Sequence, residues 1–411
     1  MTESDASRPD ASRPDASRPD ASRPDAPRAA VPRPGAPQAA RPRWSRRPSG
    51  SNWGDFGPDD QLGRLNWVGP EQVRRGAAEV REGIAFCLSL PLDLPGGNAL
   101  NPRRHAPVLR PTVRGALPNL NYVLARDDPD ATDVISDDLA ILHLQYSTQW
   151  DSLAHVGQLF DADGDGVAEP VYYNGWRAGR DVVGPAHGRD AGVPGWTAVD
   201  DGDPRVDRAG GAYLGARRES PRSSSRAHAL GIENLAAHGV QGRGVLVDLH
   251  AHFGEATRTR VGYDALMRVL EADRVEIERG DLVCLHTGFA RLLVEMGGAP
   301  DADRLHGACA ALDGRDERLL AWIDEVGLAA LAADNYAVED YPAAPGAGCC
   351  ATLPLHAHCL FRLGVPLGEL WWLTPLAGWL RAHGRSRFLL TAPPLRLPGA
   401  VGSPVTPVAT V

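Results

Sequence analysis

The sequence predicts an α/β fold for most of this 411-residue chain. Three short apolar runs, at residues 245–249, 282–286 and 328–333, have the length and composition of buried strands. Helical patterns separate these runs at residues 263–276 and 317–325. Strands that alternate with helices along the chain are typical of an α/β domain.

The elements before these strands are less regular. Pro70 stands at the favoured first position of a helix predicted over residues 71–82. Residues 94–137 are rich in proline, asparagine and arginine and are predicted to be irregular, and an apolar stretch follows at residues 139–150. Residues 158–225 contain many glycines, prolines, aspartates and serines, which favour loops.

The chain divides into a tail and one domain. ASRPD repeats four times in tandem within residues 6–25, and a proline every five residues prevents helices and sheet ladders. We therefore expect residues 1–50 to be disordered. A last helix predicted over residues 367–383 and a last strand over residues 388–391 complete a single domain of residues 51–411.

Composition excludes several classes of protein. The formal net charge is −9, and because residues 1–50 carry ten arginines and six acidic residues, the remainder is still more acidic, which argues against nucleic-acid binding. The chain contains no lysine, which excludes a pyridoxal-phosphate Schiff base, a lysine aldolase and a P-loop. It has no long apolar run, no apolar signal segment and no CxxC pair among its six cysteines, so we expect a cytoplasmic protein that does not enter a membrane.

The densest polar segment covers residues 143–155. If the segment is a strand, alternate residues share one face, and these are His143, Gln145, Ser147, Gln149 and Asp151. A row of polar side chains on an otherwise apolar segment is costly to bury without partners, so it predicts a ligand, a metal or a hydrogen-bond network. His155 lies four residues beyond Asp151, close enough to join the same site after a turn.

Two further polar groups lie in the C-terminal half. His356 and His358 are followed by Glu369, a carboxylate that either stands in the first turn of a helix or points into a site. The segment Asp248-Leu-His250-Ala-His252 resembles the HxH that begins amidohydrolase barrels, but only about 160 residues follow it, too few for most of a barrel. His252 could still approach a site from the end of a buried strand.

These motifs resemble the cyclase/kynurenine formamidase family, which includes arylformamidases and isatin hydrolases. The family signature HxGTHxDxPxH falls here on Gln145, Ser147, Thr148, Gln149, Asp151, Leu153 and His155, in a branch with STQWD in place of GTHxD. Further similar segments occur in the family's order over residues 53–404, among them WGDFGP from Trp53, YNG from Tyr173, GRGVLVD from Gly242 and ADN from Ala333.

The resemblance implies a metal-dependent hydrolase with a swivelling β/β/α-type fold and a mixed sheet. It implies that Asp151, His356 and Glu369 are metal ligands and that His155 is the general acid/base. A metal lowers the pKa of bound water and polarises a carbonyl, and histidine titrates in the range needed to move the proton. The implied substrate is an amide, formamide or cyclic amide of a small carbonyl compound, with N-formylkynurenine as the family's best-known example, and the implied assembly is a homodimer or larger.

The sequence departs from the signature because Gln145 and Gln149 stand in place of histidines. Glutamine is a poor zinc ligand and is more acceptable to a harder metal such as manganese. We therefore expect one divalent metal per chain, zinc or manganese, with Gln145 and Gln149 as hydrogen-bond partners of the substrate. A two-metal site, with His143 as a compensating ligand, and a metal-free site stay open. Trp53 or Trp150 would either stack on an aromatic substrate or lie in the core.

Two other functions are compatible with the same residues. A metal and a histidine could serve a lyase, a dehydratase or a cyclisation of a polyketide-like molecule. The loss of two ligands could instead leave a binding protein on an inherited scaffold, although the joint presence of Asp151, His155, His356 and Glu369 argues against that. In each case the expected partner is a small molecule.

Overall fold

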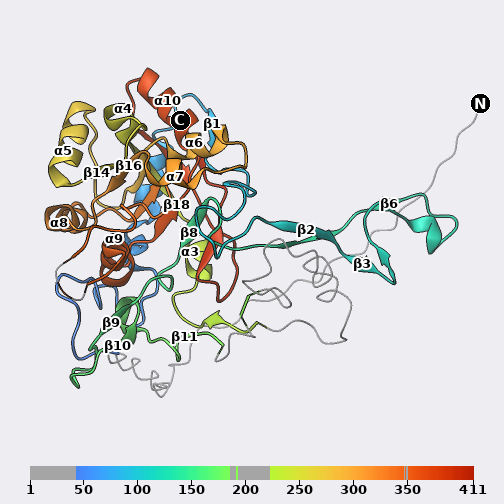
Figure 1. Ribbon diagram of the computed structural model, residues 1–411, viewed down its shortest axis with the longest axis horizontal. Helices are drawn as coiled ribbons and strands as arrows, with labels where there is room; N and C mark the ends of the chain where they lie inside the picture. The colour runs from blue at the N-terminus through green and yellow to red at the C-terminus, as the bar shows by residue number, and fades with distance from the viewer. Residues whose placement is uncertain (1–42, 186–190, 193–222, 347, 349) are drawn as a thin grey trace, which may run out of the picture. The chain divides into compact units, whose positions relative to one another are not determined.

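The computed structural model describes residues 43–185, 191–192, 223–346, 348 and 350–411. A nine-stranded mixed sheet organises the described domain, in agreement with the predicted α/β class (Figure 1). In spatial order its strands are β1 (Ala85–Cys87), β21 (Val408–Thr410), β19 (Arg387–Thr391), β13 (Gln241–Asp248), β15 (Leu282–His286), β17 (Ala330–Ala333), β18 (Leu367–Glu369), β8 (Gln149–Asp151) and β20 (Gly402–Pro404). The four strands from β13 to β18 are parallel, and the flanking pairings are antiparallel.

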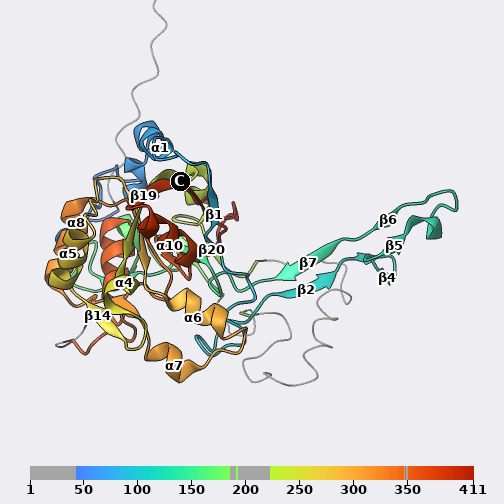
Figure 2. The same ribbon diagram turned by 90° about the horizontal axis from the view of Figure 1, so that it is seen from above.

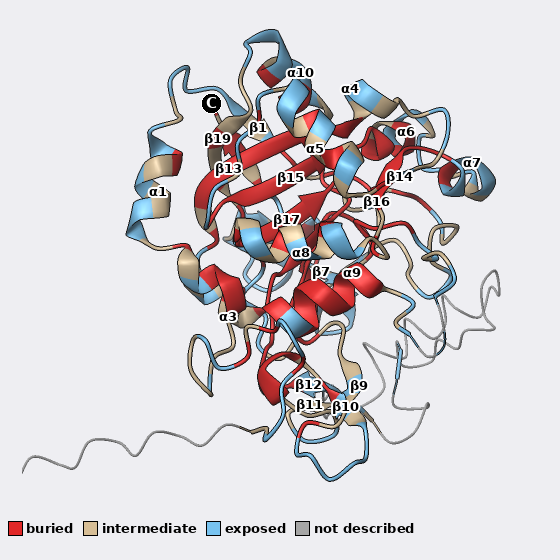
Figure 3. Cartoon of the chain, turned by 90° about the vertical axis from the view of Figure 1, so that its left-hand side faces the viewer, coloured by how far each residue is buried: buried red, intermediate tan, exposed pale blue. Residues whose placement is uncertain are grey.

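The three apolar runs of the sequence form the middle of this sheet. Strand β15 covers the predicted residues, while β13 begins at Gln241 and β17 at Ala330. Their side chains alternate between two apolar clusters, so Val245 and Val247 face one side and Leu246 the other. Figure 3 shows these strands buried behind helices with exposed outer faces. Burial on both faces explains why the runs are continuously apolar.

Helices cover both faces of the sheet. Helices α5 (Tyr263–Ala272) and α8 (Glu317–Val326) lie side by side on one face (Figure 2), where they contribute Leu266, Val269, Leu319 and Ile323. Helices α3 (Glu233–His238) and α10 (Thr374–Ala382) supply Leu235 and Leu376 to the other face. The remaining helices are α1 (Pro70–Ala77), α4 (Leu249–Phe253), α6 (Phe289–Glu295), α7 (Ala302–His306), α9 (Pro354–His356), the short helices η1 (Gly63–Trp67), η2 (Leu124–Arg126) and η3 (Tyr173–Gly175), and the π-helix η5 (Ala357–Leu363).

The prediction of a single helix over residues 367–383 is wrong. Residues Leu367–Glu369 form strand β18, and α10 begins only at Thr374, with a proline in its first turn. Leu370 has a φ of 56°, which ends the strand and prevents a continuous helix. A Cβ atom on Gly368 would lie 2.7 Å from Trp371 Nε1, so glycine allows the indole to pack onto the strand. Because of this break, Glu369 is the last residue of a strand and not part of a helix.

The polar segment 143–155 is also not one strand. Strand β7 (Asp138–Ile141) pairs with β2 (Val108–Pro111), the chain then turns, and only Gln149–Asp151 joins the sheet as β8. The region predicted to be irregular therefore contains short paired strands. The other small pairs are β3 (Val113–Arg114) with β4 (Leu117–Pro118), β5 (Tyr122–Val123) with β6 (Val134–Ile135), β9 (Gln158–Phe160) with β10 (Glu169–Val171), β11 (Val182–Val183) with β12 (Arg226–Ala227), and β14 (Thr259–Val261) with β16 (Ala310–Leu312).

The predicted tail is described only from residue 43 onward, and the repeats lie outside the described residues. The end of that segment packs on the domain: Ser45 N donates to Ala162 O at 2.8 Å, and the Trp44 ring meets Trp53 edge-on at 5.6 Å. The helix predicted to reach residue 82 ends at Ala77. Among the described residues, no helix combines the length and apolar character needed to cross a membrane.

Candidate metal centre

Three residues that are far apart in the sequence, or lie on different elements, come together at one end of the sheet. Asp151 comes from β8, Glu369 from the adjacent strand β18, and His356 from α9, and one donor atom of each lies within 4.8 Å of the others. We call Asp151, His356 and Glu369 the cavity centre. All three are at least 95% buried, so the antiparallel pairing of two strands far apart in sequence brings two carboxylates together inside the protein.

Asp151 has no hydrogen-bond partner although it is fully buried. Neither carboxylate oxygen accepts a hydrogen bond, and His155 Nε2 lies 3.7 Å from Oδ1. Burial raises the pKa of Asp151 above its usual range, the repulsion from Glu369 acts in the same direction, and His155 opposes both. A buried carboxylate without donors is costly, and a divalent cation satisfies it, so these residues fit a metal ion.

His356 is fixed by a carboxylate on each side. Its Nδ1 lies 2.8 Å from Glu339 Oε1 and its Nε2 lies 3.3 Å from Glu369 Oε1. Burial lowers the pKa of His356, but the two glutamates outweigh it and raise the pKa to about 10. Glu339 also accepts from the backbone N–H groups of Leu355 and His356 at 3.0 Å. This arrangement orients the imidazole of His356 and increases its basicity, as it does for histidines that bind metals.

Gln149 contacts the ligands rather than the open cavity. Its Nε2 donates to Glu369 Oε2 at 2.9 Å, while its Oε1 is buried without a partner. Burial raises the pKa of Glu369, but the hydrogen bond and charge of His356 outweigh burial and lower it. The structure therefore places Gln149 beside the ligands, where its amide holds Glu369 in place.

A cavity of about 130 Å³ opens onto this group. His155, His356 and Glu369 form one part of its wall, and its other polar and aromatic lining residues are Asn98, Asn101, Arg103, Arg104, Gln145, Tyr146, Tyr336 and Tyr341. Arg104 Nη1 donates to Gln145 O at 2.7 Å. The cavity thus combines a proton carrier, guanidinium groups and phenol rings next to the buried carboxylates.

Besides Gln149, three residues expected at the site do not reach this cavity. The His143 ring packs against His105 at 5.1 Å, and the turn before β8 removes it from the row predicted for a strand. Trp53 and Trp150 are fully buried, and their Nε1 atoms donate to Phe361 O at 2.7 Å and Ala392 O at 2.8 Å. Their rings belong to the apolar core and offer no face to a substrate.

Sequence reasoning missed Glu339 and Arg104. Glu339 follows β17 through a loop, and Arg104 lies in the segment predicted to be irregular, so neither belongs to a motif that predicts a site. His252, in contrast, does not approach the cavity centre and pairs with Asp273 at 3.0 Å. Only the folded chain shows which charged loop residues face the ligands.

The family of the chain follows from comparison with known proteins. The model of the Cyclase family, described as "Putative cyclase", matches residues 101–340, more than half of the chain. The chain therefore belongs to this family, which agrees with the resemblance seen in its motifs. A search of curated proteins finds no match.

Solved structures of similar fold include a crystal structure described as a novel cyclase, with 29% identity, coverage of 88% of this chain and 97% of that chain, and a TM-score of 0.60. Isatin hydrolase A from Labrenzia aggregata has 14% identity, with 82% and 95% coverage and a TM-score of 0.46. A predicted metal-dependent hydrolase from Bacillus stearothermophilus has 12% identity, with 80% and 98% coverage and a TM-score of 0.40.

Proposed function

We propose that this member of the Cyclase family is a metal-dependent hydrolase that acts on an amide, formamide or cyclic amide of a small carbonyl compound. The observation that carries the proposal is Asp151, a fully buried carboxylate with no hydrogen-bond partner, grouped with His356 and Glu369. His155 lies beside it and lines the adjoining cavity. A metal site, a proton carrier and a cavity are the parts that such a hydrolysis needs.

The residues divide the work between binding and proton transfer. Asp151, His356 and Glu369 would hold one divalent ion, zinc or manganese, which when bound supplies Lewis acidity towards the carbonyl and lowers the pKa of water. His155 accepts a proton from the attacking water and returns it to the departing nitrogen as the C–N bond breaks. Its side chain is 22% exposed, so both water and substrate can reach it.

The cavity suits a small, flat substrate with a polar or anionic group. Tyr146, Tyr336 and Tyr341 offer ring surface, and Arg103 and Arg104 offer donors for a carbonyl or carboxylate. An aryl amide, an N-formyl aryl amine or a cyclic amide combines these features. We also propose that the chain works as a homodimer or a larger homo-oligomer.

The first experiment removes the unpartnered carboxylate. In Asp151→Asn we expect the bound metal to be lost and kcat/KM on the best substrate of an aryl formamide and cyclic amide panel to fall about 1,000-fold or more. Asp303→Asn, at an exposed position of α7, is the matched control. His155→Ala should lower kcat while the metal is retained. If Asp151→Asn keeps both metal and activity, the proposal fails.

The products separate hydrolysis from the alternative reactions. Hydrolysis transfers oxygen from isotope-labelled water into the acid product, whereas a lyase or a cyclisation does not. Turnover without label in the product would favour a lyase or cyclase acting at the same site. Tight binding of panel compounds without turnover would favour a binding protein.

A further inference from the structure

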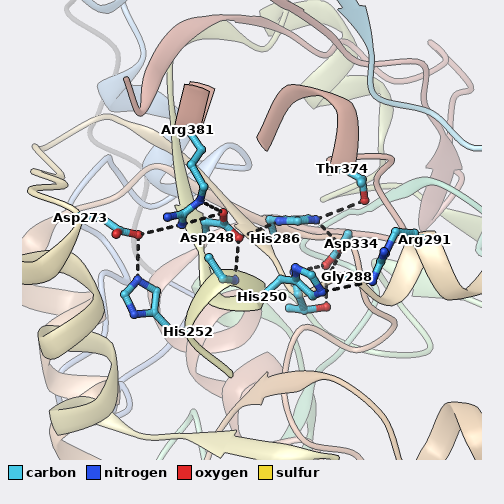
Figure 4. A network of polar contacts seen from close by, with 12 residues as sticks. Asp248, His250, His252, Asp273, His286, Gly288, Arg291, Asp334, Thr374 and Arg381 are labelled. Carbon is cyan, nitrogen blue, oxygen red and sulfur yellow. Dashed lines mark hydrogen bonds and ion pairs between the residues drawn. The ribbon is translucent and has the colours of Figure 1, made fainter. Parts of the chain in front are cut away.

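A second group of metal-type side chains lies on the same edge of the sheet, outside the cavity centre. Asp248 ends β13 and His286 ends β15, the neighbouring parallel strand, while His250 lies in α4 directly after β13. None of the three lines the cavity described above. Figure 4 shows them converging from these elements, and we call them the edge centre. The carboxyl ends of parallel strands are where open α/β sheets place ligands.

The distances within the edge centre match those of a metal-ligand set. One donor atom from each of Asp248, His250 and His286 lies within 4.8 Å of the others. His286 Nδ1 is 2.8 Å from Asp248 Oδ1, and the rings of His250 and His286 are 5.3 Å apart. Asp248 and His286 are buried, while the side chain of His250 is 27% exposed. An ion therefore has a route to the group from the side of His250.

Each of the three residues is also held from outside the group. Arg381 Nε donates to Asp248 Oδ2 at 2.8 Å, and Thr374 Oγ1 lies 3.2 Å from His286 Nε2, both from α10. Glu255 Oε2 lies 3.5 Å from His250 Nε2. Arg291 Nη2 also donates to His250 Nε2, at 3.4 Å. Partners of this kind orient metal-binding histidines and carboxylates in proteins.

The surrounding charges favour a cation. Five carboxylates take part in the contact network, and only two guanidinium groups oppose them. The carboxylates are Asp248, Asp273, Glu255, Glu295 and Asp334, and the guanidinium groups are Arg381 and Arg291. The excess of negative charge favours a bound cation. Two imidazole nitrogens and one carboxylate oxygen are the donors that zinc prefers, with water in the fourth position.

We propose that Asp248, His250 and His286 form a second divalent-metal site, for which Zn²⁺ is the best-suited ion. Binding would replace the contact between His286 Nδ1 and Asp248 Oδ1. The ion joins the ends of β13 and β15 to α4. This site does not depend on the function proposed for the cavity centre.

The test compares two histidines of α4. His250 and His252 have the same 27% side-chain exposure, but His252 pairs with Asp273 and takes no part in the edge centre. We would strip the full chain with a chelator, titrate it with Zn²⁺ by calorimetry, and count bound zinc by elemental mass spectrometry. His250→Ala should lose about one zinc equivalent, and His252→Ala should keep the wild-type number.

Two more variants make the result decisive. His356→Ala, in the cavity centre, should leave the zinc of the edge centre in place, so failure of one site is distinguished from failure of the other. Thr374→Val should weaken zinc binding about tenfold without removing a ligand, which keeps the test valid if His250→Ala melts early. The proposal is overturned if His250→Ala and Thr374→Val bind zinc as the wild type does, or if His356→Ala removes all bound zinc.

Discussion

The cavity centre and the edge centre lie on one sheet but hold their aspartates in opposite ways. Asp151 has no hydrogen-bond partner for either oxygen, whereas Asp248 receives a contact on each, from His286 and from Arg381. Burial dominates at Asp151 and raises its pKa. At Asp248 burial acts in the same direction, but His286 and Arg381 outweigh it and lower the pKa to about 2.

This difference separates a buried carboxylate without partners from one that has a partner on each oxygen. The free-energy cost of burying the charged Asp151 is offset only when a cation lies beside it. The edge centre already forms an ion-pair network, so a metal there competes with a proton. We therefore expect metal removal to affect the cavity centre more strongly, and a count of two metals per chain need not mean two ions in the cavity.

The largest effect expected from a residue that touches no substrate comes from Glu339→Gln. The amide cannot accept from both His356 and Leu355 as the carboxylate does, so His356 loses its fixed orientation. We expect kcat to fall about 10- to 100-fold, with a matching loss of metal affinity. Glu317→Gln, on an exposed turn of α8, is the control. Unchanged steady-state kinetics would show that His356 needs no carboxylate behind it.

Restoring a signature histidine sharpens the contrast further. Gln149 already contacts Glu369, so the imidazole of Gln149→His lies close enough to join the cavity centre. Because imidazole is a better zinc ligand than an amide, zinc affinity there should rise about tenfold or more, while the edge centre stays unchanged. Gln158→His, on strand β9, controls for an added surface histidine. Equal zinc affinity in the two variants would place position 149 out of reach of the metal.

The sequence predicted the middle of the fold for a physical reason, because buried parallel strands need continuous apolar runs. Asp151, His155, His356 and Glu369 were named from the resemblance to a family signature. The structure brings Asp151, His356 and Glu369 together, and their roles stay a prediction. The roles expected for Trp53 and Trp150 depended on which way a ring faces, and that is decided by packing against residues distant in the chain.

The sequence-based predictions that failed share one cause. In each, contacts with residues distant in the chain outweigh the local sequence pattern. The helix pattern over residues 367–383 was broken by the positive φ of Leu370 and by the indole packed on Gly368. Glu339 could not be found because acidic residues in a loop, here Glu339 and Asp340, carry no periodicity. Of the edge centre, the sequence indicated only the HxH-like segment that contains Asp248 and His250. The third residue, His286, is the last of an apolar run that predicts a strand.

A smaller effect is expected from a methyl group placed against the edge centre. Gly288 has a φ of 86°, and a Cβ atom there would lie 2.4 Å from Cδ2 of His250. Gly288→Ala should therefore displace His250 and destabilise the protein by about 1–3 kcal/mol, measured by urea unfolding. Gly239→Ala shares the positive φ but has open space around its Cβ, so it isolates backbone strain. Equal zinc binding by the two variants would show that the His250 ring can move without losing a ligand position.

The smallest effect on either centre should follow from changing a carboxylate that backbone groups already satisfy. Asp316 accepts from the N–H groups of Tyr263, Arg318 and Leu319, and so caps α8 and holds the start of α5. Burial raises its pKa, but these backbone donors outweigh burial and lower it. Asn keeps only one acceptor oxygen and so cannot serve both helices, and Asp316→Asn should therefore cost about 1 kcal/mol of unfolding free energy at neutral pH, with metal content unchanged. Because the folded pKa lies below the ordinary value of 3.8, the difference from wild type is present above that pH and is lost as the pH falls below it. A stability difference that persists in strong acid would mean that the carboxylate charge is not what caps the helix.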